Sequence, residues 1–426
     1  MKNILIIVTQ DYGGAGEVMF KLAKMLNSEH RVALLVKEKT KNDKFIYQYN
    51  ISSYQILKKK IFNKFFSFLK QKNQFLNKYS FYALDECKKN TNPKNIIKKI
   101  GFVPEYIFNG WSSNFMNSTD LLNLQLLTKA EVYNITVDMN HFTGGCHYSW
   151  DCKKYITGCD IHCPALELNH DKTIALKNLN KKLLNSKKGD FKILAASGWT
   201  LKQAQESKIY REQQIIYNIN SLIDTEIMNN NCRNIAKQIF GLDTNYFYVL
   251  AGCKDATDPR KGFDYFVKGL DILYKKIDKN ISKKIKVLIV TDTIDYSNYE
   301  LIHFEKKYID FVKDYRLLSL VYQSADLYVN TSIEDSGPMM VSEALACGTP
   351  VVGFDMGIVN NMVVNDYNGY KAILKDSYDL ANGIYKIFNL NEKEYLNYSN
   401  NAVISVKNHA SLDYGKKIIN KILYQN

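Results

Sequence analysis

The sequence predicts an α/β protein with two doubly wound domains, each a parallel sheet covered by helices. Two observations lead to this prediction. Short apolar runs alternate with stretches of helical spacing in the first half of the chain, and the same alternation begins again in the second half. In addition, 426 residues of which 46% are hydrophobic suffice for two cores of ordinary size. Ligands of such domains bind at the carboxyl ends of the strands.

The expected elements follow from the apolar patterns. The first-half strands are expected at residues 4–8, 31–36, 106–108, 131–137, 192–195 and 215–217, with helices at 17–26 and 120–128. The second-half strands are expected at 246–251, 286–290, 327–330 and 350–354, with helices at 262–277 and 317–324. A last helix is expected at 412–424.

The domain boundary is expected near residue 190, because residues 181–190 form a run rich in lysine and asparagine. We therefore expect one domain at 1–190, a second at 191–405, and a terminal helical segment at 406–426.

The most informative segment is 331–352, in which Asp335 and Glu343 are separated by seven residues. The turn at 336–338 leads into an expected helix, whose first N–H groups and dipole attract an anion such as phosphate. The two acids can accept hydrogen bonds from sugar hydroxyls. Phosphate and sugar together indicate a nucleotide-sugar site. The alternative is an ordinary helix capped by Asp335 or Ser336.

A second phosphate site is predicted at Arg260 and Lys261, which follow the strand at 246–251 and open the next helix. Positive charge at the start of a helix is disfavoured by the helix dipole. An anionic ligand explains these residues better than helix stability does. The alternative is solvent-exposed charge on a loop.

A glycine-rich loop, with Gly13, Gly14 and Gly16, lies between the first strand and the first helix. Glycines let a backbone approach a ligand closely. The spacing differs from the Gly-x-Gly-x-x-Gly dinucleotide pattern. A tight turn with a purely structural role is the alternative.

Four cysteines lie within eighteen residues of the loop 138–164, and His147 and His162 lie among them. In a reducing compartment, clustered thiols are suited to a soft metal, and four thiolates can form a structural zinc site. Disulfides or free buried thiols are the alternatives. The candidate metal ligands are Cys146, Cys152, Cys159 and Cys163.

Residues 55–78 form an amphipathic stretch with an apolar face surrounded by lysines. Together with the net charge of +14, this stretch favours contact with an anionic membrane surface. A helix docked on the first domain is the alternative. No nucleic-acid-binding motif is evident, so nucleic acid is not expected as a partner. The N-terminal apolar run is too brief for a signal peptide or a membrane span, so the protein is expected in the cytoplasm.

The acidic motif resembles that of family 4 glycosyltransferases, which are retaining enzymes of the GT-B architecture. Most members have Glu at the first position, where this chain has Asp335. The cysteine loop, beginning Thr-Gly-Gly-Cys-His-Tyr, resembles a subset of these enzymes that build bacterial surface polysaccharides. Many of those relatives have His-Asp before the loop; here Val137 stands at the histidine position and Asp138 remains.

The resemblance implies two Rossmann-like domains facing a central cleft, with the acceptor bound by the first domain and the nucleotide-sugar donor by the second. It implies that the terminal helical segment crosses back to the first domain. The resemblance places three residues at the acceptor side or near the donor phosphates, namely Gly13, Gly14 and Asp138.

In the second domain, the resemblance implies that Glu343 holds the ribose of the donor and Asp335 the sugar hydroxyls. The diphosphate would be held by backbone N–H groups near two methionines and by two basic residues, namely Met339, Met340, Arg260 and Lys261. The family transfers sugar by front-face substitution, assisted by the leaving phosphate. No catalytic metal is then required, because the basic residues and helix dipoles stabilise the departing charge.

These features predict a retaining hexosyltransferase that acts on a glycan or lipid-linked acceptor in bacterial surface polysaccharide synthesis, at the inner face of the plasma membrane. Another GT-B activity, such as an epimerase or phosphorylase, is one alternative. A non-catalytic, membrane-associated component of a polysaccharide assembly complex is the other. The departures at Asp335 and Val137 are the features that support the non-catalytic alternative.

Overall fold

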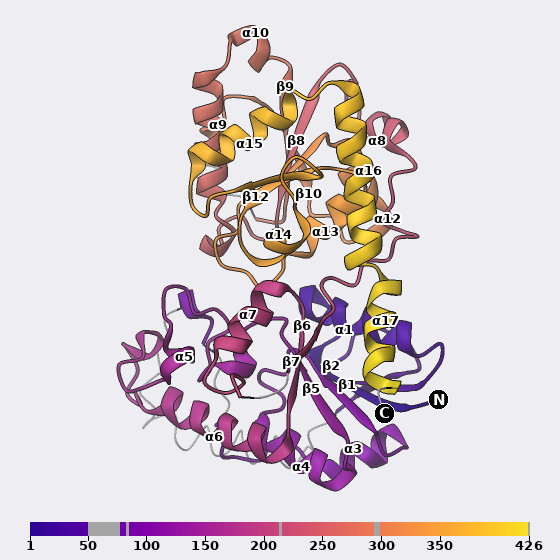
Figure 1. The fold of residues 1–426 in the computed structure, drawn as a ribbon, viewed down its shortest axis with the longest axis vertical. Coiled ribbons are helices and arrows are strands. Elements are labelled where there is room, and N and C mark those ends of the chain that lie inside the picture. Colours follow the sequence, from indigo (N-terminus) through magenta and orange to yellow (C-terminus); the bar gives the residue numbers. More distant parts are fainter. Residues whose placement is uncertain (50–76, 82–84, 213–214, 294–298, 425–426) are drawn as a thin grey trace. The chain divides into compact units, whose positions relative to one another are not determined.

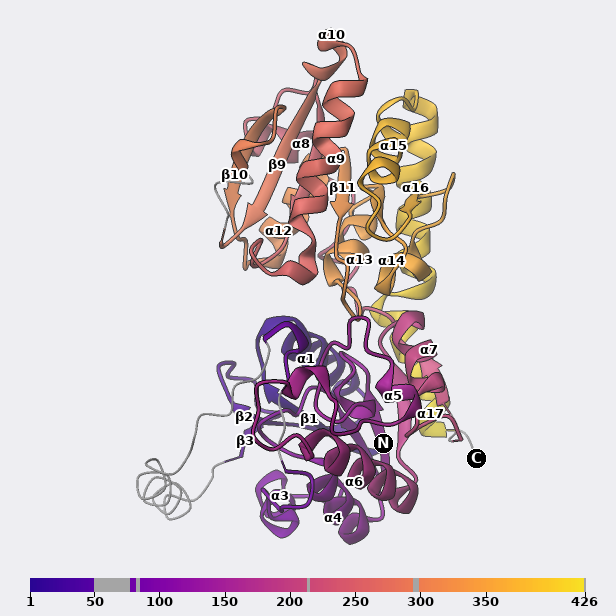
Figure 2. The same ribbon diagram turned by 90° about the vertical axis from the view of Figure 1, so that its left-hand side faces the viewer.

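The computed structural model describes residues 1–49, 77–81, 85–212, 215–293 and 299–424. These residues form two compact units, each with its own parallel sheet (Figures 1 and 2). The first unit comprises Met1–Ala196 and Thr200–Asn218, and the second comprises Ser197–Trp199 and Ile219–Asn426. Two doubly wound α/β units were expected from the repeated strand–helix alternation, and this expectation is confirmed.

The first sheet has seven strands in the order β3-β2-β1-β4-β5-β6-β7, and all pair in parallel. The chain therefore reverses its direction of winding between β1 and β4, which makes the carboxyl ends of these two strands the topological switch point. The strands are β1 (Asn3–Gln10), β2 (Arg31–Glu38), β3 (Ile46–Gln48), β4 (Tyr106–Asn109), β5 (Glu131–Ile135), β6 (Lys192–Ala195) and β7 (Ile215–Asn218).

Helices connect these strands, as parallel pairing requires. Those of the first unit, with three 3-10 turns, are α1 (Gly13–Leu26), η1 (Asn77–Tyr79), α3 (Pro93–Ile100), α4 (Ser118–Thr128), η2 (Asn140–Phe142), α5 (Lys154–Thr157), η3 (Pro164–Leu166), α6 (Ile174–Gly189) and α7 (Gly198–Glu206).

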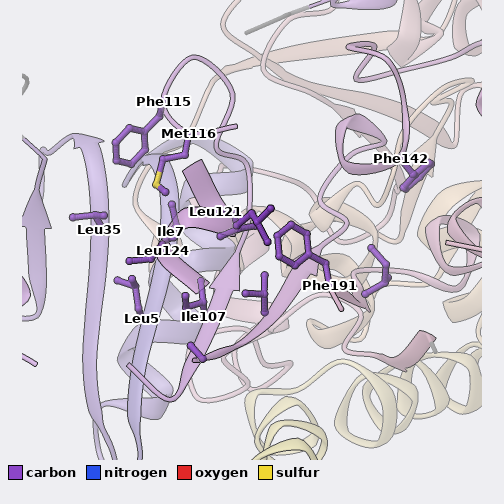
Figure 3. Packing of buried hydrophobic residues seen from close by; sticks show 14 of the residues in the cluster. Leu5, Ile7, Leu35, Ile107, Phe115, Met116, Leu121, Leu124, Phe142 and Phe191 are labelled. Atoms are coloured by element: carbon purple, nitrogen blue, oxygen red, sulfur yellow. The ribbon is translucent and has the colours of Figure 1, made fainter. Parts of the chain in front are cut away.

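The core of the first unit forms where apolar strand residues meet apolar helix residues. Leu5 and Ile7 of β1 point to the same face because strand side chains alternate. They belong to one buried cluster with Ile107 of β4 and with Leu121 and Leu124 of α4 (Figure 3). The covering helix explains why these strands are continuous apolar runs rather than alternating patterns.

The second sheet has six parallel strands in the order β10-β9-β8-β11-β12-β13. Its switch point lies between β8 and β11. The strands are β8 (Phe247–Gly252), β9 (Ile285–Thr291), β10 (Glu305–Asp310), β11 (Leu327–Asn330), β12 (Val351–Phe354) and β13 (Gly369–Ala372).

Both faces of the second sheet are buried. Along β8, Val249 and Ala251 belong to one core cluster, whereas Tyr248 and Leu250 belong to another. Helices therefore cover both faces of this sheet. The helical elements of the second unit, listed in chain order, are α8 (Arg233–Ile239), η4 (Pro259–Lys261), α9 (Phe263–Lys276), α10 (Lys279–Ser282), α12 (Tyr315–Ser324), α13 (Met339–Ala346), α14 (Gly357–Met362), α15 (Ser377–Phe388), α16 (Glu392–His409) and α17 (Leu412–Tyr424).

The division between the units differs from the expected boundary at residue 190. Strands β6 and β7 pair onto the edge of the first sheet, so the first unit continues to Asn218. The short segment Ser197–Trp199 belongs to the second unit, because the Ser197 hydroxyl donates to the backbone carbonyl of Ser336 at 2.6 Å. The lysine-rich run at 181–190 is the end of α6 rather than a linker.

The end of the chain also differs from the expectation in one detail. Helix α16 continues to His409, past residue 406, where the terminal segment was expected to begin. A capping box of Asn391 and Glu394 starts this helix, and α17 begins at Leu412, three positions after the last residue of α16. The predicted crossing of the terminal helix to the first unit stays a prediction.

No helix within the described residues is long and apolar enough to cross a membrane. The amphipathic stretch predicted to contact a membrane, 55–78, lies almost wholly outside the described residues, which resume at 77.

Candidate functional site

Two loops meet at the carboxyl edge of the second sheet, at its switch point. The loop after β8 ends in η4, which carries Arg260 and Lys261, and the loop after β11 carries Asp335. The backbone N–H of Ile333 donates to the Arg260 carbonyl at 2.8 Å, and the hydroxyl of Thr331 donates to the Lys261 carbonyl at 3.0 Å. The predicted phosphate loop and the predicted acidic motif are therefore bonded to each other.

Lys261 and Asp335 form an ion pair, with 2.5 Å between Nζ and Oδ2. Burial by itself would raise the pKa of Asp335, but the bonded Lys261 ammonium and the nearby Arg260 hold this pKa below its usual range. Arg260 pairs with Asp258 at 2.5 Å. The site thus holds two cations that are fixed in position by carboxylates of the same chain.

Gly262 is required for the close approach of the two loops. Its φ is +61°, and a Cβ at this position would lie 2.2 Å from the carbonyl oxygen of Thr331. Only glycine accepts this backbone conformation without strain and leaves room for the neighbouring carbonyl. Helix α9 begins at Phe263, so the basic residues sit in a 3-10 turn just before the helix.

Helix α13 begins directly after the acidic turn. Its N-cap residue is Pro338, whose side chain has no atom that can accept a hydrogen bond from the first N–H groups. Met339 and Met340, the residues expected to supply backbone donors, are the first two residues of the helix. This end of the helix therefore presents N–H groups and a partial positive charge to an anion.

Glu343 lies on the same helix and is 3% exposed. The hydroxyl of Tyr322, which lies on α12, donates to Glu343 Oε2 at 2.9 Å. The sequence did not single out Tyr322, because α12 precedes the motif and only the packing of α12 against α13 brings the two side chains together. Both acids of the motif are thus bound by a donor from a different element.

The glycine loop of the first unit follows β1 at the other switch point. Helix α1 begins at Gly13, which has a φ of +71°, and its N-cap residue is Tyr12. The Tyr12 hydroxyl donates to Glu38 instead of capping the helix. Gly16 has the tightest surroundings, since a Cβ there would lie 2.5 Å from the Gln10 carbonyl. For Gly14, by contrast, a Cβ would meet no atom within 4 Å among the described residues.

Asp138 follows β5 and is paired with His147 of the cysteine loop, a partner that the sequence did not indicate. The distance from Asp138 Oδ2 to His147 Nδ1 is 2.5 Å, and both side chains are buried. Burial would raise the pKa of Asp138, but His147 holds it below its usual range. The Nε2 atom of His147 lies 3.0 Å from the hydroxyl of Ser113, in the loop after β4. The predicted contact of Asp138 with substrate stays a prediction.

A small polar cavity of about 30 Å³ lies at the carboxyl ends of β4 and β5. Asn109, Asn134, His141 and Lys182 are among the residues that line it. Within the described part of the chain, Oδ1 of Asn109 is buried without a hydrogen-bond partner. A water molecule fits a cavity of this size and would satisfy that oxygen.

The cysteine loop does not form the expected metal site. Within the described residues, no three His, Cys, Asp or Glu side chains are grouped to hold a metal ion. Cys146 donates a hydrogen bond to Cys163, which lowers the pKa of Cys163 to about 7. Burial raises the pKa of Cys159 to about 11. All eight cysteines are free thiols, so of the three alternatives the structure supports unbridged thiols. The zinc expectation finds no support.

Residues 257–389 match the model of a family described as glycosyl transferases group 1. This range contains Arg260, Lys261, Asp335 and Glu343. An uncharacterized glycosyltransferase of Haemophilus influenzae is 26% identical over 174 residues, which are 37% of this chain. The match covers 43% of that relative's length.

The structure is similar to several solved proteins over nearly its whole length. Sucrose-phosphate synthase from Thermosynechococcus elongatus has a TM-score of 0.65 at 14% identity, covering 100% of this chain and 99% of that one. Anabaena HepE in complex with UDP and glucose has a TM-score of 0.63 at 14% identity, covering all of both chains. WaaG, a glycosyltransferase involved in lipopolysaccharide biosynthesis, has a TM-score of 0.60 at 11% identity, covering 99% and 100%.

The two parallel sheets and these similarities define the class: the protein has the GT-B fold. The range 257–389, which matches the group 1 glycosyl transferase model, contains the basic and acidic residues of the two loops at the switch point of the second sheet. The narrower subset suggested by the cysteine loop stays a prediction.

Proposed function

We propose that the protein is a retaining glycosyltransferase that transfers a sugar from a nucleotide-sugar donor to a glycan or lipid-linked acceptor. The observation that carries the proposal is the bonding of the Lys261 loop to the acidic motif at one switch point. Two fixed cations, an uncapped helix start and two carboxylates lie on three adjacent segments of one unit. Phosphates, ribose and a sugar are the groups that such a set recognises.

In this proposal, Lys261 and Arg260 bind the diphosphate together with the N–H groups of Met339 and Met340. Glu343 accepts hydrogen bonds from the ribose, and Asp335 accepts them from the transferred sugar. Gly13, Gly14 and Asp138 belong to the first unit and border the acceptor or the donor phosphates.

The proposed reaction is a front-face substitution in which the bond from the sugar to the departing phosphate breaks as the acceptor oxygen attacks from the same side. The leaving phosphate takes the proton of the acceptor hydroxyl. Catalysis then consists of positioning and of stabilising negative charge on the departing diphosphate. Lys261 and Arg260 carry the positive charge that this step needs, so no catalytic metal is required.

The relatives indicate which donor to test first. HepE has been solved with UDP, with UDP and glucose, and with UDP-glucose. WaaG is described as acting in lipopolysaccharide biosynthesis. We therefore rank a UDP-sugar first among donors and a bacterial surface glycan or its lipid-linked precursor first among acceptors. The proposed location is the cytoplasm, peripheral to the inner face of the plasma membrane, where such precursors are elongated.

The test is calorimetric titration of the purified protein with UDP, GDP and ADP, repeated on Glu343→Ala. We expect one nucleotide to bind with a dissociation constant in the micromolar range, and the substitution to weaken that binding. The identity of this nucleotide then selects the sugars to test as donors.

If none of the three binds at millimolar concentration, the transferase proposal is wrong and a non-catalytic role in an assembly complex becomes the better explanation. In that case membrane and partner binding should survive the Lys261→Ala substitution. Binding that is equal in the wild type and in Glu343→Ala would instead reject the proposed role of Glu343 alone.

A further inference from the structure

Glu343 is a carboxylate in an almost fully buried position, which is costly unless hydrogen-bond donors compensate for the lost water. One such donor is the hydroxyl of Tyr322, at 2.9 Å from Oε2. The two residues lie 21 positions apart and on different helices, α12 and α13. The bond therefore joins the acidic motif to an element outside it.

Tyr322 is itself held rigidly. Its side chain is fully buried, and its ring packs edge-on against that of Tyr328, with 5.9 Å between the ring centres. The Thr349 hydroxyl donates to the Tyr322 carbonyl at 2.7 Å, which ties α12 to the turn after α13. A hydroxyl on so fixed a ring can hold its partner in one orientation.

The Tyr322 hydroxyl also remains a donor at every physiological pH. Burial raises its pKa well above the usual range, and the charge of Glu343 raises it further. Its proton is therefore retained and stays available to the carboxylate. A carboxylate has about four lone-pair positions, and the bond from Tyr322 occupies one of them, so this bond does not by itself prevent Glu343 from accepting a bond from a ligand.

We propose that Tyr322 is a positioning residue for recognition of the donor's ribose, acting by orienting the carboxylate of Glu343. This inference rests on the proposed function, because it assumes that Glu343 contacts the ribose. The inference assigns a role to a residue outside the acidic motif. Its consequence is that the protein's preference for ribose over a sugar without hydroxyls depends on the buried phenol of Tyr322.

The chain offers a matched control in Tyr328. It is fully buried like Tyr322, and its hydroxyl lies 3.4 Å from the backbone carbonyl of Gly252 rather than on Glu343. Tyr322→Phe and Tyr328→Phe each remove one buried hydroxyl from the same tyrosine pair. A general loss of stability should affect both variants, whereas a loss of ribose recognition should affect only the first.

The experiment measures dissociation constants for UDP, GDP and ADP and for their 2′,3′-dideoxy forms by calorimetry, on the wild type, both tyrosine variants and Glu343→Gln. In the wild type, the nucleotide that binds should bind more tightly than its dideoxy form. The ratio of the dideoxy dissociation constant to that of the parent nucleotide measures ribose recognition. Tyr322→Phe should reduce this ratio by roughly 10-fold, the effect of losing a hydrogen bond to a charged group. Affinity for the dideoxy form should not change, and Tyr328→Phe should keep the wild-type ratio.

The double variant Tyr322→Phe/Glu343→Gln should have the ratio of Glu343→Gln alone, because a positioning residue has no effect once its partner is altered. An unchanged ratio in Tyr322→Phe, or an equal loss in Tyr328→Phe, would overturn the inference while leaving the donor site in place. Failure of the wild type to bind any of the nucleotides would reject the proposed function and the inference with it.

Discussion

At the scale of single residues, the ion pair of Lys261 and Asp335 is the central interaction of the candidate site. Lys261 is partly accessible, with 24% of its side chain exposed, whereas 11% of the Asp335 side chain is exposed. Such a pair keeps the ammonium in one place before a ligand arrives. A positive charge that is already in position costs no reorganisation when negative charge develops on a departing phosphate.

We expect Lys261→Ala to reduce release of the nucleotide from a nucleotide-sugar donor by roughly 100-fold, the cost of removing one fixed charge-stabilising donor. The measurement is turnover of the donor selected by the titrations. Lys275→Ala is the matched control, since Lys275 also pairs with a carboxylate, Asp271 at 2.7 Å, but on an exposed face of α9. Full turnover in Lys261→Ala, or an equal loss in Lys275→Ala, would contradict the assigned role.

His141 gives a prediction about pH. Burial lowers its pKa to about 4, although the nearby charge of Asp138 opposes this shift. In an unfolded chain the pKa of histidine is about 6.5. Between these values the unfolded chain binds a proton that the folded chain does not, so the free energy of unfolding rises with pH across this window.

Replacing His141 by Gln should remove this contribution, which we put at roughly 1–3 kcal/mol over the whole window. The measurement is the urea midpoint of the wild type and of His141→Gln at pH 4.5 and pH 7. The wild type should lose more stability than the variant when the pH is lowered. The same loss in both proteins would show that the pKa of His141 is not lowered in the folded protein.

At the scale of elements, the two loops at the switch point of the second sheet depend on a backbone contact rather than on side chains. The loop after β8 approaches the loop after β11 so closely that Gly262 has no room for a side chain. The bonds from Ile333 and Thr331 to the carbonyls of residues 260 and 261 depend on this approach. A substitution that pushes these two loops apart should move Lys261 away from Asp335.

We expect Gly262→Ala to weaken nucleotide binding by at least roughly 10-fold and to lower the thermal midpoint, because the added Cβ displaces the loop. Gly241→Ala is the control. Gly241 has nearly the same φ, +59°, but a Cβ there would meet no atom within 4 Å among the described residues. The two variants share the backbone strain, and only the first adds the clash. If both weaken nucleotide binding equally, the close approach of the loops is not needed.

The elements predicted from sequence were mostly those with continuous apolar runs. The strands β1, β2 and β11 lie within a few residues of the expected positions, because their burial on both faces makes them apolar throughout. Strand β10, with the sequence Glu-Lys-Lys-Tyr-Ile-Asp, was not expected. It lies at the edge of the sheet and is mostly exposed, so its residues carry no apolar pattern.

At the scale of the whole molecule, the excess of 57 basic over 43 acidic residues favours an anionic surface as a partner. The sequence concentrates lysines beside the apolar residues of 55–72, including Lys58, Lys59 and Lys60. Membrane contact through this stretch remains a proposal that can be tested directly.

We expect the protein to sediment with vesicles that contain anionic lipid and not with neutral vesicles, and to dissociate as salt is raised. Replacing Lys58, Lys59 and Lys60 by Gln should weaken this binding by roughly 10-fold or more. The control replaces the same number of exposed lysines in α16 and α17, namely Lys393, Lys417 and Lys421. Equal weakening in both variants would indicate general charge attraction rather than a specific contact surface.

The class of fold could be predicted from the sequence alone, and so could the two segments that meet at the switch point of the second sheet, whereas their binding to a donor stays a prediction. Strand–helix alternation depends on local patterns of apolar residues, and the acidic motif with its helix start is contained in one short segment. Arg260 and Lys261 could be singled out for the same reason, because positive charge directly before a helix is a local anomaly. Their binding to an anion stays a prediction.

The side-chain partners of the motif residues and the extent of the first unit could be learned only from the tertiary structure. Tyr322 binds Glu343 from 21 positions away, and the first unit extends through β7 because β7 pairs with β6. His147 is only nine positions from Asp138, but the fold of the cysteine loop decides that the two side chains meet. The arrangement of the four loop cysteines also depends on tertiary packing. Spacing along the chain made a metal site conceivable, but the directions of the side chains depend on how the loop packs on Phe81 and its neighbours, which no local pattern encodes.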